Sequence, residues 1–235
     1  MTKYKRILLK LSGEVLMGKK SFGLDNIVVE KIALQIKQVF KLNIEICMVV
    51  GGGNIFRGIS AASKGVDRST ADYMGMLATL INALSLQNAL EKISVQTRVQ
   101  SAIPVSQIAE PYIRRKAIRH LEKKRIVIFG AGTGNPFFTT DTASALRATE
   151  MNCDAIFKAT KVDGVYDKDP LNFKNAKLIK KIKYDDVLNK NIKIMDATSI
   201  TLAKESNIPI IVTSLKKKNA LIEAIKGYGN FSIIS

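Results

Sequence analysis

The sequence has few of the residues on which several kinds of structural and catalytic site depend. Its 235 residues include two cysteines, one histidine and no tryptophan. Cys47 and Cys153 each stand in an apolar or helical stretch, which argues against a disulfide scaffold and a cysteine zinc site and favours a reducing compartment. The one histidine, His120, stands among arginines and lysines, and we expect it on the surface of a basic helix. Histidine triads and histidine-rich metal sites are therefore excluded.

Long hydrophobic runs and linkers are also missing. No apolar run approaches the length that crosses a bilayer, and the first residues predict a strand and not a signal peptide. We find no internal repeat, low-complexity segment or linker rich in proline or serine. These features predict a cytoplasmic protein with no membrane partner, large enough to bury a sizeable core.

Acidic residues are scarce, with 20 Asp and Glu against 37 Lys and Arg and a formal net charge of +17. A charge this high can mark a nucleic-acid partner. However, the bases are 28 lysines and only nine arginines, the lysines are scattered in short groups, and no stacking aromatics lie between them. We therefore interpret the charge as solvated lysine-rich faces that help to collect anionic nucleotides, and a nucleic acid is not required.

Strand-like and helix-like runs alternate along the chain. Strands are expected at residues 6–11, 44–50, 95–100, 125–129, 155–159, 208–213 and 231–234, and helices near 27–41, 70–92, 112–123, 141–151, 197–205 and 219–226. Near-continuous β-branched strands between helices predict an α/β fold, with an open, mostly parallel sheet covered by helices on both faces. The polar stretch from Lys161 to Lys183 is expected to be a long loop or a small hairpin.

A glycine-rich loop runs from Gly130 to Ala143, between an apolar strand and a helix for which Thr140 or Asp141 could be the N-cap. Freed backbone amides and the positive end of a helix suit a bound phosphate. The glycine spacing is not the dinucleotide fingerprint. The adjacent Phe137 and Phe138 are costly in a loop unless something covers them, which favours a ligand loop over a plain turn.

Other strand ends carry the same kinds of residue, as expected where ligands bind beyond the carboxyl ends of parallel strands. Lys10 and Gly13 end the first strand, and three glycines and then Arg57 follow the second. A lysine at the end of an apolar strand either snorkels or points at an anion. Gly18-Lys19 is a near miss to a P-loop, which we reject because Lys20 stands where a hydroxyl should bind magnesium.

At these motifs the sequence resembles the amino acid kinase superfamily, and within it the bacterial uridylate (UMP) kinases, over nearly its whole length. Broad superfamily features are Lys10–Gly13, Gly51–Gly53 and Thr160–Tyr166. Segments more specific to uridylate kinases are Gly53–Gly58, Asp72–Thr79 and Thr133–Asp141, of which the last is the most discriminating.

The resemblance implies an α/β/α sandwich and transfer of the γ-phosphoryl group of Mg-ATP to UMP. It implies one domain over residues 1–235, with the UMP side mainly in 1–150 and the ATP side mainly in 151–235 plus 10–13. By matching motif, the ATP residues are Lys10, Leu11, Ser12, Gly13, Gly53, Arg57, Thr160, Tyr166 and Asp169. The UMP residues are Gly52, Asp72, Thr133, Gly134, Asn135, Pro136, Phe137, Phe138, Thr139 and Thr140.

For the chemistry, Lys10 and Arg57 are expected to stabilise the transferring phosphoryl group, while Asp141 and Asp196 orient them or water on Mg²⁺. The metal is expected to be held mainly by nucleotide phosphates and water, with no direct protein ligand. Structural alternatives stay open for several residues. Asp72 and Asp196 could only cap helices, Tyr166 could be a hairpin aromatic, and Asp169 before proline could be ordinary turn chemistry.

The resemblance also implies a homohexamer built from dimers, and the helix from about Thr70 to Leu90 is apolar on more than one stripe, as a dimer contact would require.

Some family members bind GTP as an activator at a subunit junction. Matching candidates here are Gly18, Lys19, Lys20, Ser21, Phe22 and Gly23, with Arg98 and Arg125. Glu91 and Glu122 stand near those arginines and disfavour a triphosphate there.

Two rival functions remain at this point. One is another kinase of the superfamily, with a carboxylate or carbamate as acceptor, against which Phe137 and Phe138 argue. The other is a non-catalytic, basic module that senses nucleotides and binds nucleic acid. The presence of Lys10, Arg57 and Asp141 argues against this second alternative.

Overall fold

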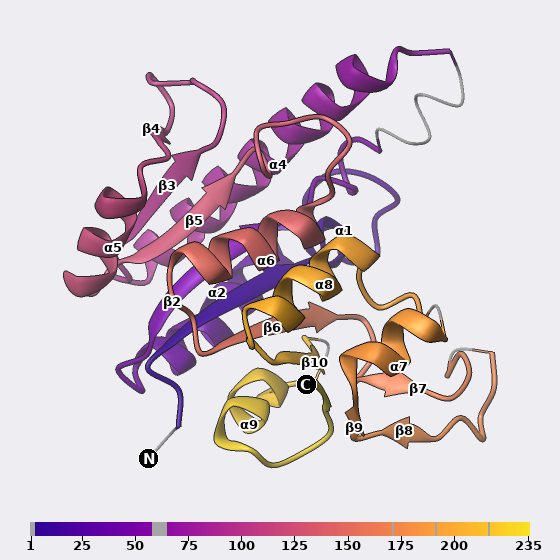
Figure 1. The fold of residues 1–235 in the computed structure, drawn as a ribbon. Helices are drawn as coiled ribbons and strands as arrows, with labels where there is room; N and C mark the ends of the chain where they lie inside the picture. The colour runs from indigo at the N-terminus through magenta and orange to yellow at the C-terminus, as the bar shows by residue number, and fades with distance from the viewer. Residues whose placement is uncertain (1–2, 58–64, 171, 191, 216) are drawn as a thin grey trace.

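The computed structural model describes residues 3–57, 65–170, 172–190, 192–215 and 217–235. Gly58, the last residue of one quoted motif, lies outside these ranges. Figure 1 shows a central sheet with helices packed against it and a small hairpin beside one end of the sheet.

The main sheet has nine strands in the order β4-β3-β5-β2-β1-β6-β10-β11-β9. Adjacent strands pair in parallel, except β10 and β11, which are antiparallel. The strands are β1 (Arg6–Leu11), β2 (Glu45–Val50), β3 (Thr97–Ser101), β4 (Glu110–Pro111), β5 (Ile126–Gly130), β6 (Ala155–Thr160), β9 (Lys181–Ile182), β10 (Ile210–Ser214) and β11 (Ser232–Ile234).

Helices cover both faces of this sheet, which confirms the predicted α/β fold. One hydrophobic core contains residues of α1 (Gly13–Leu16), α2 (Asn26–Phe40), α4 (Arg68–Lys92) and α9 (Ala220–Lys226). The other contains residues of α5 (Arg114–Glu122), α6 (Thr140–Glu150), α7 (Tyr184–Asn189) and α8 (Ala197–Glu205). In Figure 1, α6 and α8 lie in front of the sheet and α2 lies behind it.

The two-residue alternation of the central strands supplies both cores. In β1, Ile7 and Leu9 belong to the core under α2 and α4, whereas Leu8 belongs to the core under α6 and α8. Lys10 has the parity of Leu8, so its side chain leaves the sheet on the α6 side. Lys158 of β6 is the register partner of Lys10 and lies on the same face.

Side-chain caps fix where the functional helices begin. Asp67, and not Asp72, caps α4, because its carboxylate accepts from the amide of Thr70 at 2.8 Å. The N-cap of α6 is Thr139, which accepts from the amide of Asp141, so the expected cap at Thr140 or Asp141 is wrong by one or two residues. In both helices the capping residue stands directly before the first turn.

The stretch 161–183 contains the predicted small hairpin, formed by antiparallel β7 (Val165–Tyr166) and β8 (Leu178–Ile179). The short elements α1, α7, β4 and β9 were not expected, because elements this short do not display a helical or strand period. Among the described residues, no helix is both long and apolar enough to cross a membrane.

Candidate active site

Two lysines from neighbouring strands share one carboxylate at the carboxyl end of the sheet. Lys10 Nζ lies 2.5 Å from Asp141 Oδ1, and Lys158 Nζ lies 2.9 Å from Asp141 Oδ2. Lys158 also donates to the carbonyl of Ile194. The predicted pair of Lys10 and Asp141 is therefore part of a triad that includes Lys158, which the sequence reasoning missed.

The two lysines of this triad are buried, Asp141 is largely shielded, and the two ammonium groups outnumber the one carboxylate of the triad. Burial opposes ionisation of Asp141, but the ammonium groups of Lys10 and Lys158 outweigh it, and the pKa of the Asp141 carboxyl lies below its usual value. The pKa of the Lys158 ammonium is lowered because burial, and then the charge of Lys10, disfavours its protonated form against the attraction of Asp141. A buried site with surplus positive charge suits a polyphosphate.

Asp196 connects the starts of α6 and α8 beside this triad. Its carboxylate accepts from the hydroxyl of Thr139 and, at 3.0 and 3.1 Å, from the hydroxyl of Thr142. It also accepts from the amide of Ser199 at 2.7 Å, as the N-cap of α8. Asp196 does cap α8, as the structural alternative expected. Its carboxylate also holds the N-terminus of α6, which that alternative did not include.

The glycines after β1 and β2 allow these two strand ends to pack directly against each other. A Cβ on Gly13 would lie 2.5 Å from the carbonyl oxygen of Gly51 and 2.5 Å from Asn54 Oδ1, so only glycine fits. Asn54 is itself fixed by Asn82 of α4, whose amide donates to the carbonyl of Gly51 at 2.6 Å. The loop is therefore rigid where a phosphate would approach the backbone.

The other basic groups of this edge converge on Glu14 of α1. Arg57 donates to one oxygen of Glu14, and Lys161 Nζ lies 3.0 Å from the other. The hydrogen bond from Lys161, opposed by burial and assisted by Arg57, lowers the pKa of Glu14. Arg57 also donates to the carbonyl of Gly53 at 3.2 Å, so it turns back over the glycine loop as its position in the sequence suggested.

A second feature is a cavity of about 140 Å³ between the start of α4, the loop after β5 and the start of α6. It brings together six of the predicted UMP residues: Gly52, Asp72, Thr133, Phe138, Thr139 and Thr140. Phe56, Gly75, Met76, Thr79 and Gly132 line it as well and were not predicted. Gly75, Met76 and Thr79 stand in the quoted segment 72–79, so the motif itself was the available signal.

The loop after β5 is shaped by contacts to α4. The amide of Ala131 donates to the Thr79 hydroxyl at 2.8 Å, and the amide of Phe137 donates to Asp72 Oδ2 at 2.8 Å. Asp72 also pairs with Arg68 at 2.9 Å. Phe137 and Phe138 are 66% and 51% exposed, and that a ligand covers them stays a prediction.

The remaining predicted residues lie around this centre. Leu11 ends β1 and Ser12 precedes α1, while Thr160 ends β6 and uses its hydroxyl to close the turn to Val162. Tyr166 lies on β7 and Asp169 in the turn that follows. The loop residues Gly134, Asn135, Pro136 and Phe137 are outside the cavity lining. Their roles stay predictions.

Lys158 could have been found from the sequence. Like Lys10, it is a lysine near the end of an otherwise apolar strand, in Ala155–Thr160. The structure adds that the two strands are neighbours and that the two lysines are in register.

His120 is not the exposed residue that the sequence suggested. It is 9% exposed, and its Nε2 lies 3.0 Å from Glu110 Oε2, because the segment through β4 folds against α5. Its Nδ1 lies 3.2 Å from Arg125 Nη1. Glu110 lies in β4, the edge strand of the sheet. His120 therefore belongs to a structural cluster at that edge and not to the triad.

The candidate GTP residues fall at opposite edges of the sheet. Gly18–Gly23 follow β1 and α1 at the carboxyl edge, whereas Arg98 and Arg125 stand at the starts of β3 and β5. Arg98 lies 3.6 Å from Glu91, and Arg125 donates to Gln96 at 3.2 Å. Within one chain these groups do not form a single site.

This arrangement, a parallel α/β sheet with basic and glycine-rich strand ends, has counterparts among known proteins. A profile of the amino acid kinase family matches residues 5–214, and the chain belongs to this family. Within it, the chain is similar to uridylate kinases. It is 57% identical to the uridylate kinase of Roseobacter denitrificans over 229 residues, covering 97% of this chain and 95% of that one. It is 56% identical to that of Paramagnetospirillum magneticum over 233 residues, covering 99% and 97%.

Two solved structures agree. The UMP kinase of Bacillus anthracis superimposes with a TM-score of 0.94 at 42% identity, over 99% of this chain and 96% of that one. The UMP kinase of Ureaplasma parvum superimposes with a TM-score of 0.93 at 38% identity, over 99% of both chains. Fold and family are therefore the same as those expected from the motifs.

Proposed function

We propose that this chain is a nucleoside monophosphate kinase that transfers the γ-phosphoryl group of Mg-ATP to UMP and releases UDP and ADP. The observation that carries the proposal is the small cavity between Asp72 and the threonines at the start of α6, directly beside the triad of Lys10, Asp141 and Lys158. An acceptor in the cavity and a donor at the triad would meet at the N-terminus of α6. The uridylate kinase relatives support this choice of acceptor.

In the proposed reaction, an oxygen of the UMP phosphate attacks the γ-phosphorus of ATP. A new P–O bond forms, the bond to the β–γ bridging oxygen breaks, and the electron pair leaves with ADP. The UMP phosphate has a second pKa near 6, so at neutral pH its oxygen is already anionic and needs no enzyme base. The task of the protein is to position two anions and to offset their repulsion.

The residues present divide this task. The surplus charge of Lys10 and Lys158, together with Arg57, would stabilise the transferring group, while Asp141 fixes both lysines. Asp72 would accept from ribose hydroxyls, as acidic residues do in other nucleotide folds. The hydroxyls of Thr139 and Thr140 lie at the N-terminus of α6, where amides and the helix dipole favour a phosphate.

Magnesium fits this site as a partner of the nucleotide. Among the described residues no cluster of three or more Asp, Glu, His or Cys side chains is arranged to hold a metal, and Asp141 and Asp196 are hydrogen-bonded to neighbours. Mg²⁺ bound to phosphates and water would neutralise phosphate charge, and the two aspartates would orient that water.

We propose a cytoplasmic enzyme of pyrimidine nucleotide biosynthesis, formed of one domain with the acceptor side mainly in residues 1–150 and the ATP side in 151–235 plus 10–13. It would act as a homohexamer built from dimers, with no membrane or nucleic acid required. GTP binding through Gly18–Gly23 and Arg98 or Arg125 would need two subunits, because these groups lie at opposite edges of the sheet.

The deciding experiment is a coupled assay of ADP release in which UMP, CMP, aspartate, glutamate and carbamate are offered separately. We expect turnover with UMP far above that with the others. Turnover with an amino acid or carbamate and none with UMP would instead establish the rival kinase, and ATP binding without any turnover would establish a sensing module.

A further inference from the structure

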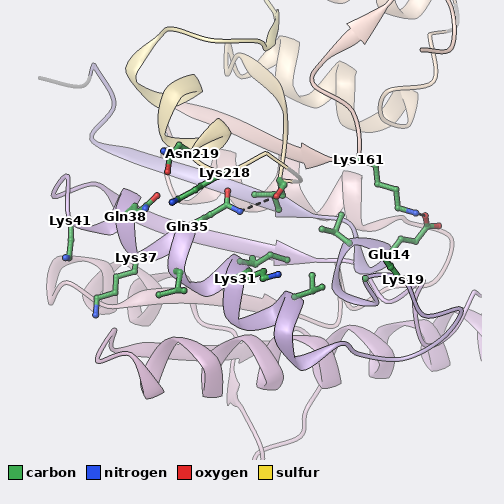
Figure 2. A pocket seen from close by; sticks show the side chains of 16 residues that line it. Glu14, Lys19, Lys31, Gln35, Lys37, Gln38, Lys41, Lys161, Lys218 and Asn219 are labelled. Atoms are coloured by element: carbon green, nitrogen blue, oxygen red, sulfur yellow. Dashed lines mark hydrogen bonds and ion pairs between the residues drawn. The ribbon is translucent and has the colours of Figure 1, made fainter. Parts of the chain in front are cut away.

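A groove far larger than the acceptor cavity runs along α2 on the face shared with α9. Its volume is about 850 Å³, within the range of sites that enclose a small molecule. Ile32 of α2 and Leu215, which precedes α9, line it and are themselves buried. The Gln35 side chain donates to the Leu215 carbonyl at 3.2 Å and ties the two walls together (Figure 2).

Lysines surround this apolar groove. Six lysines line it, against one acidic residue, Glu14, which already pairs with Lys161 and Arg57. Lys37 is engaged with the carbonyl of Ile93 at 2.6 Å. Over the part of the chain that the structure describes, no ion pair involves the other four lining lysines, Lys19, Lys31, Lys41 and Lys218. An anion would therefore meet ammonium groups that have no intramolecular counter-ion.

The shape and lining of the groove point to a chain and not to a ring. None of the lining residues is aromatic, so a nucleobase would find no side chain to stack on. The walls are instead aliphatic, with Val15, Val28 and Leu34 beside the two buried residues.

We propose that this groove binds a soluble single-chain amphiphile with an anionic head group, that is, a long-chain acyl carboxylate. The head group lies at the end formed by Lys41, Lys218 and Asn219, where no acidic side chain lines the groove. The acyl chain extends toward the other end of the groove, where Figure 2 shows Glu14 beside Lys161 and where Val15 also belongs to the lining. The carboxylate of Glu14 makes that end less favourable for the anionic head group. Val15 belongs to the same short helix as Gly13, so an occupied groove contacts the loop at the triad from its far side.

The test is binding of cis-parinarate, a fluorescent long-chain carboxylate, to the full chain below the micellar concentration of the probe. We expect saturable binding near one equivalent per chain, and much weaker binding of its methyl ester. In the triple variant Lys31→Glu, Lys41→Glu, Lys218→Glu, the Kd should rise about tenfold or more, since each exposed ion pair contributes up to about 1 kcal/mol. Leu34→Glu tests the groove wall independently, because Leu34 is 53% exposed and its replacement does not threaten folding.

The triple variant Lys116→Glu, Lys123→Glu, Lys124→Glu is the matched control, because it makes the same charge change on three exposed lysines in or directly after α5, on the other face of the sheet. It should leave the Kd within a factor of about two. Equal weakening by this triple control variant would overturn the proposal in favour of a general charge effect. So would the absence of saturable binding, displacement of the probe by GTP, or co-sedimentation only with anionic phosphatidylglycerol vesicles, the last of which would identify a membrane surface.

Discussion

The three charges of Lys10, Asp141 and Lys158 are the residue-scale feature on which the proposed chemistry depends. Two ammonium groups against one carboxylate leave a positive charge within the triad, which the neighbouring Asp196 carboxylate attracts and which would also favour an anionic ligand. Because the site is largely closed to water, that charge interacts strongly with a phosphoryl group and is weakly screened by salt.

Replacement of Lys10, Lys158 or Arg57 by alanine should lower kcat. Removing one preorganised cation from a transferring group should cost about 2.7–4 kcal/mol, by analogy with oxyanion donors. The measurement is kcat with UMP saturating and folding verified by circular dichroism, with Lys226→Ala on the exposed end of α9 as the control. Rates within a few-fold of wild type for any of the three would remove that residue from the chemistry.

Asp141 should also contribute pH-dependent stability. Its pKa is lowered in the folded protein, so its contribution is fully present above the usual value of 3.8 and is lost as pH falls through the lower folded-state pKa. At neutral pH, Asp141→Asn should lower the free energy of unfolding by about 3–5 kcal/mol, because it leaves two buried ammonium groups uncompensated.

Urea denaturation of wild type and Asp141→Asn at several pH values measures this gap, which should narrow at acid pH. Asp185→Asn is the control, because Asp185 pairs with Lys204 at 2.5 Å but its side chain is 62% exposed. It should cost at most about 1 kcal/mol. A gap that stays constant down to the lowest pH would show that the charge of Asp141 is not what stabilises the protein.

The acid limb of kcat/KM for UMP should follow the ionisation of UMP itself. No enzyme base is needed if the attacking phosphate oxygen is already anionic, and His120 lies with Glu110 away from the triad. His120→Ala should therefore leave the profile unmoved, while an acceptor analogue with a lower second pKa should move the limb down. A limb that is fixed across acceptors and shifts in Asp141 or His120 variants would reveal an enzyme base.

At the scale of elements, the close packing of β2 on α4 decides which glycines the loop after β2 requires. A Cβ on Gly52 would lie 2.8 Å from the carbonyl oxygen of Gly75 and 3.1 Å from the amide of Thr79, both backbone atoms of α4. A Cβ on the next residue, Gly53, would meet nothing closer than the Arg57 side chain at 3.9 Å. The two glycines are neighbours, but only the first is sterically constrained.

Gly52→Ala should therefore destabilise the protein by about 1–3 kcal/mol, as overpacking does, since two helical backbone atoms cannot move aside cheaply. Gly53→Ala should change the free energy of unfolding by less than about 0.5 kcal/mol, although it could affect kcat through Arg57. Denaturant unfolding of the pair measures the difference. Equal stabilities would mean that α4 shifts away from β2 without cost.

At the scale of the whole molecule, α4 has two apolar stripes. Met76, Leu80 and Leu86 are buried against the sheet, whereas Tyr73, Leu77 and Ile81 form a second stripe that is 45–50% exposed. Residues spaced by four lie on one face of a helix, so this stripe is continuous. Contiguous exposed apolar surface of this kind marks a protein interface.

We predict that light scattering finds the wild-type protein to be an oligomer at micromolar concentration. The double variant Leu77→Glu, Ile81→Glu should have a lower particle mass, because association through this stripe would bury the two new carboxylates in an apolar interface. Ile27→Glu is the control, since Ile27 is exposed on α2 and outside this stripe. A wild-type particle with the mass of one chain would rule out the interface.

The sequence by itself determined the fold class and the family, and it supplied most residues of the candidate site. The apolar strands alternating with helices predicted the parallel sheet, and the glycines and Lys10 at strand ends predicted the edge at which we propose that ligands bind. These predictions are possible because period, glycine content and the lone charge in an apolar run are local properties of the chain. The motifs then specified the family more narrowly than composition could.

Only the tertiary structure decided what depends on contacts between distant segments. Lys158 joins the site because β6 pairs with β1 in a register that places it beside Lys10, and register is set by packing across 148 residues of sequence. His120 is buried because β4 folds against α5, and the lysine-lined groove exists because α9 packs beside α2. Neither contact leaves a local pattern in the chain, since side-chain partners far apart in sequence are chosen by the fold.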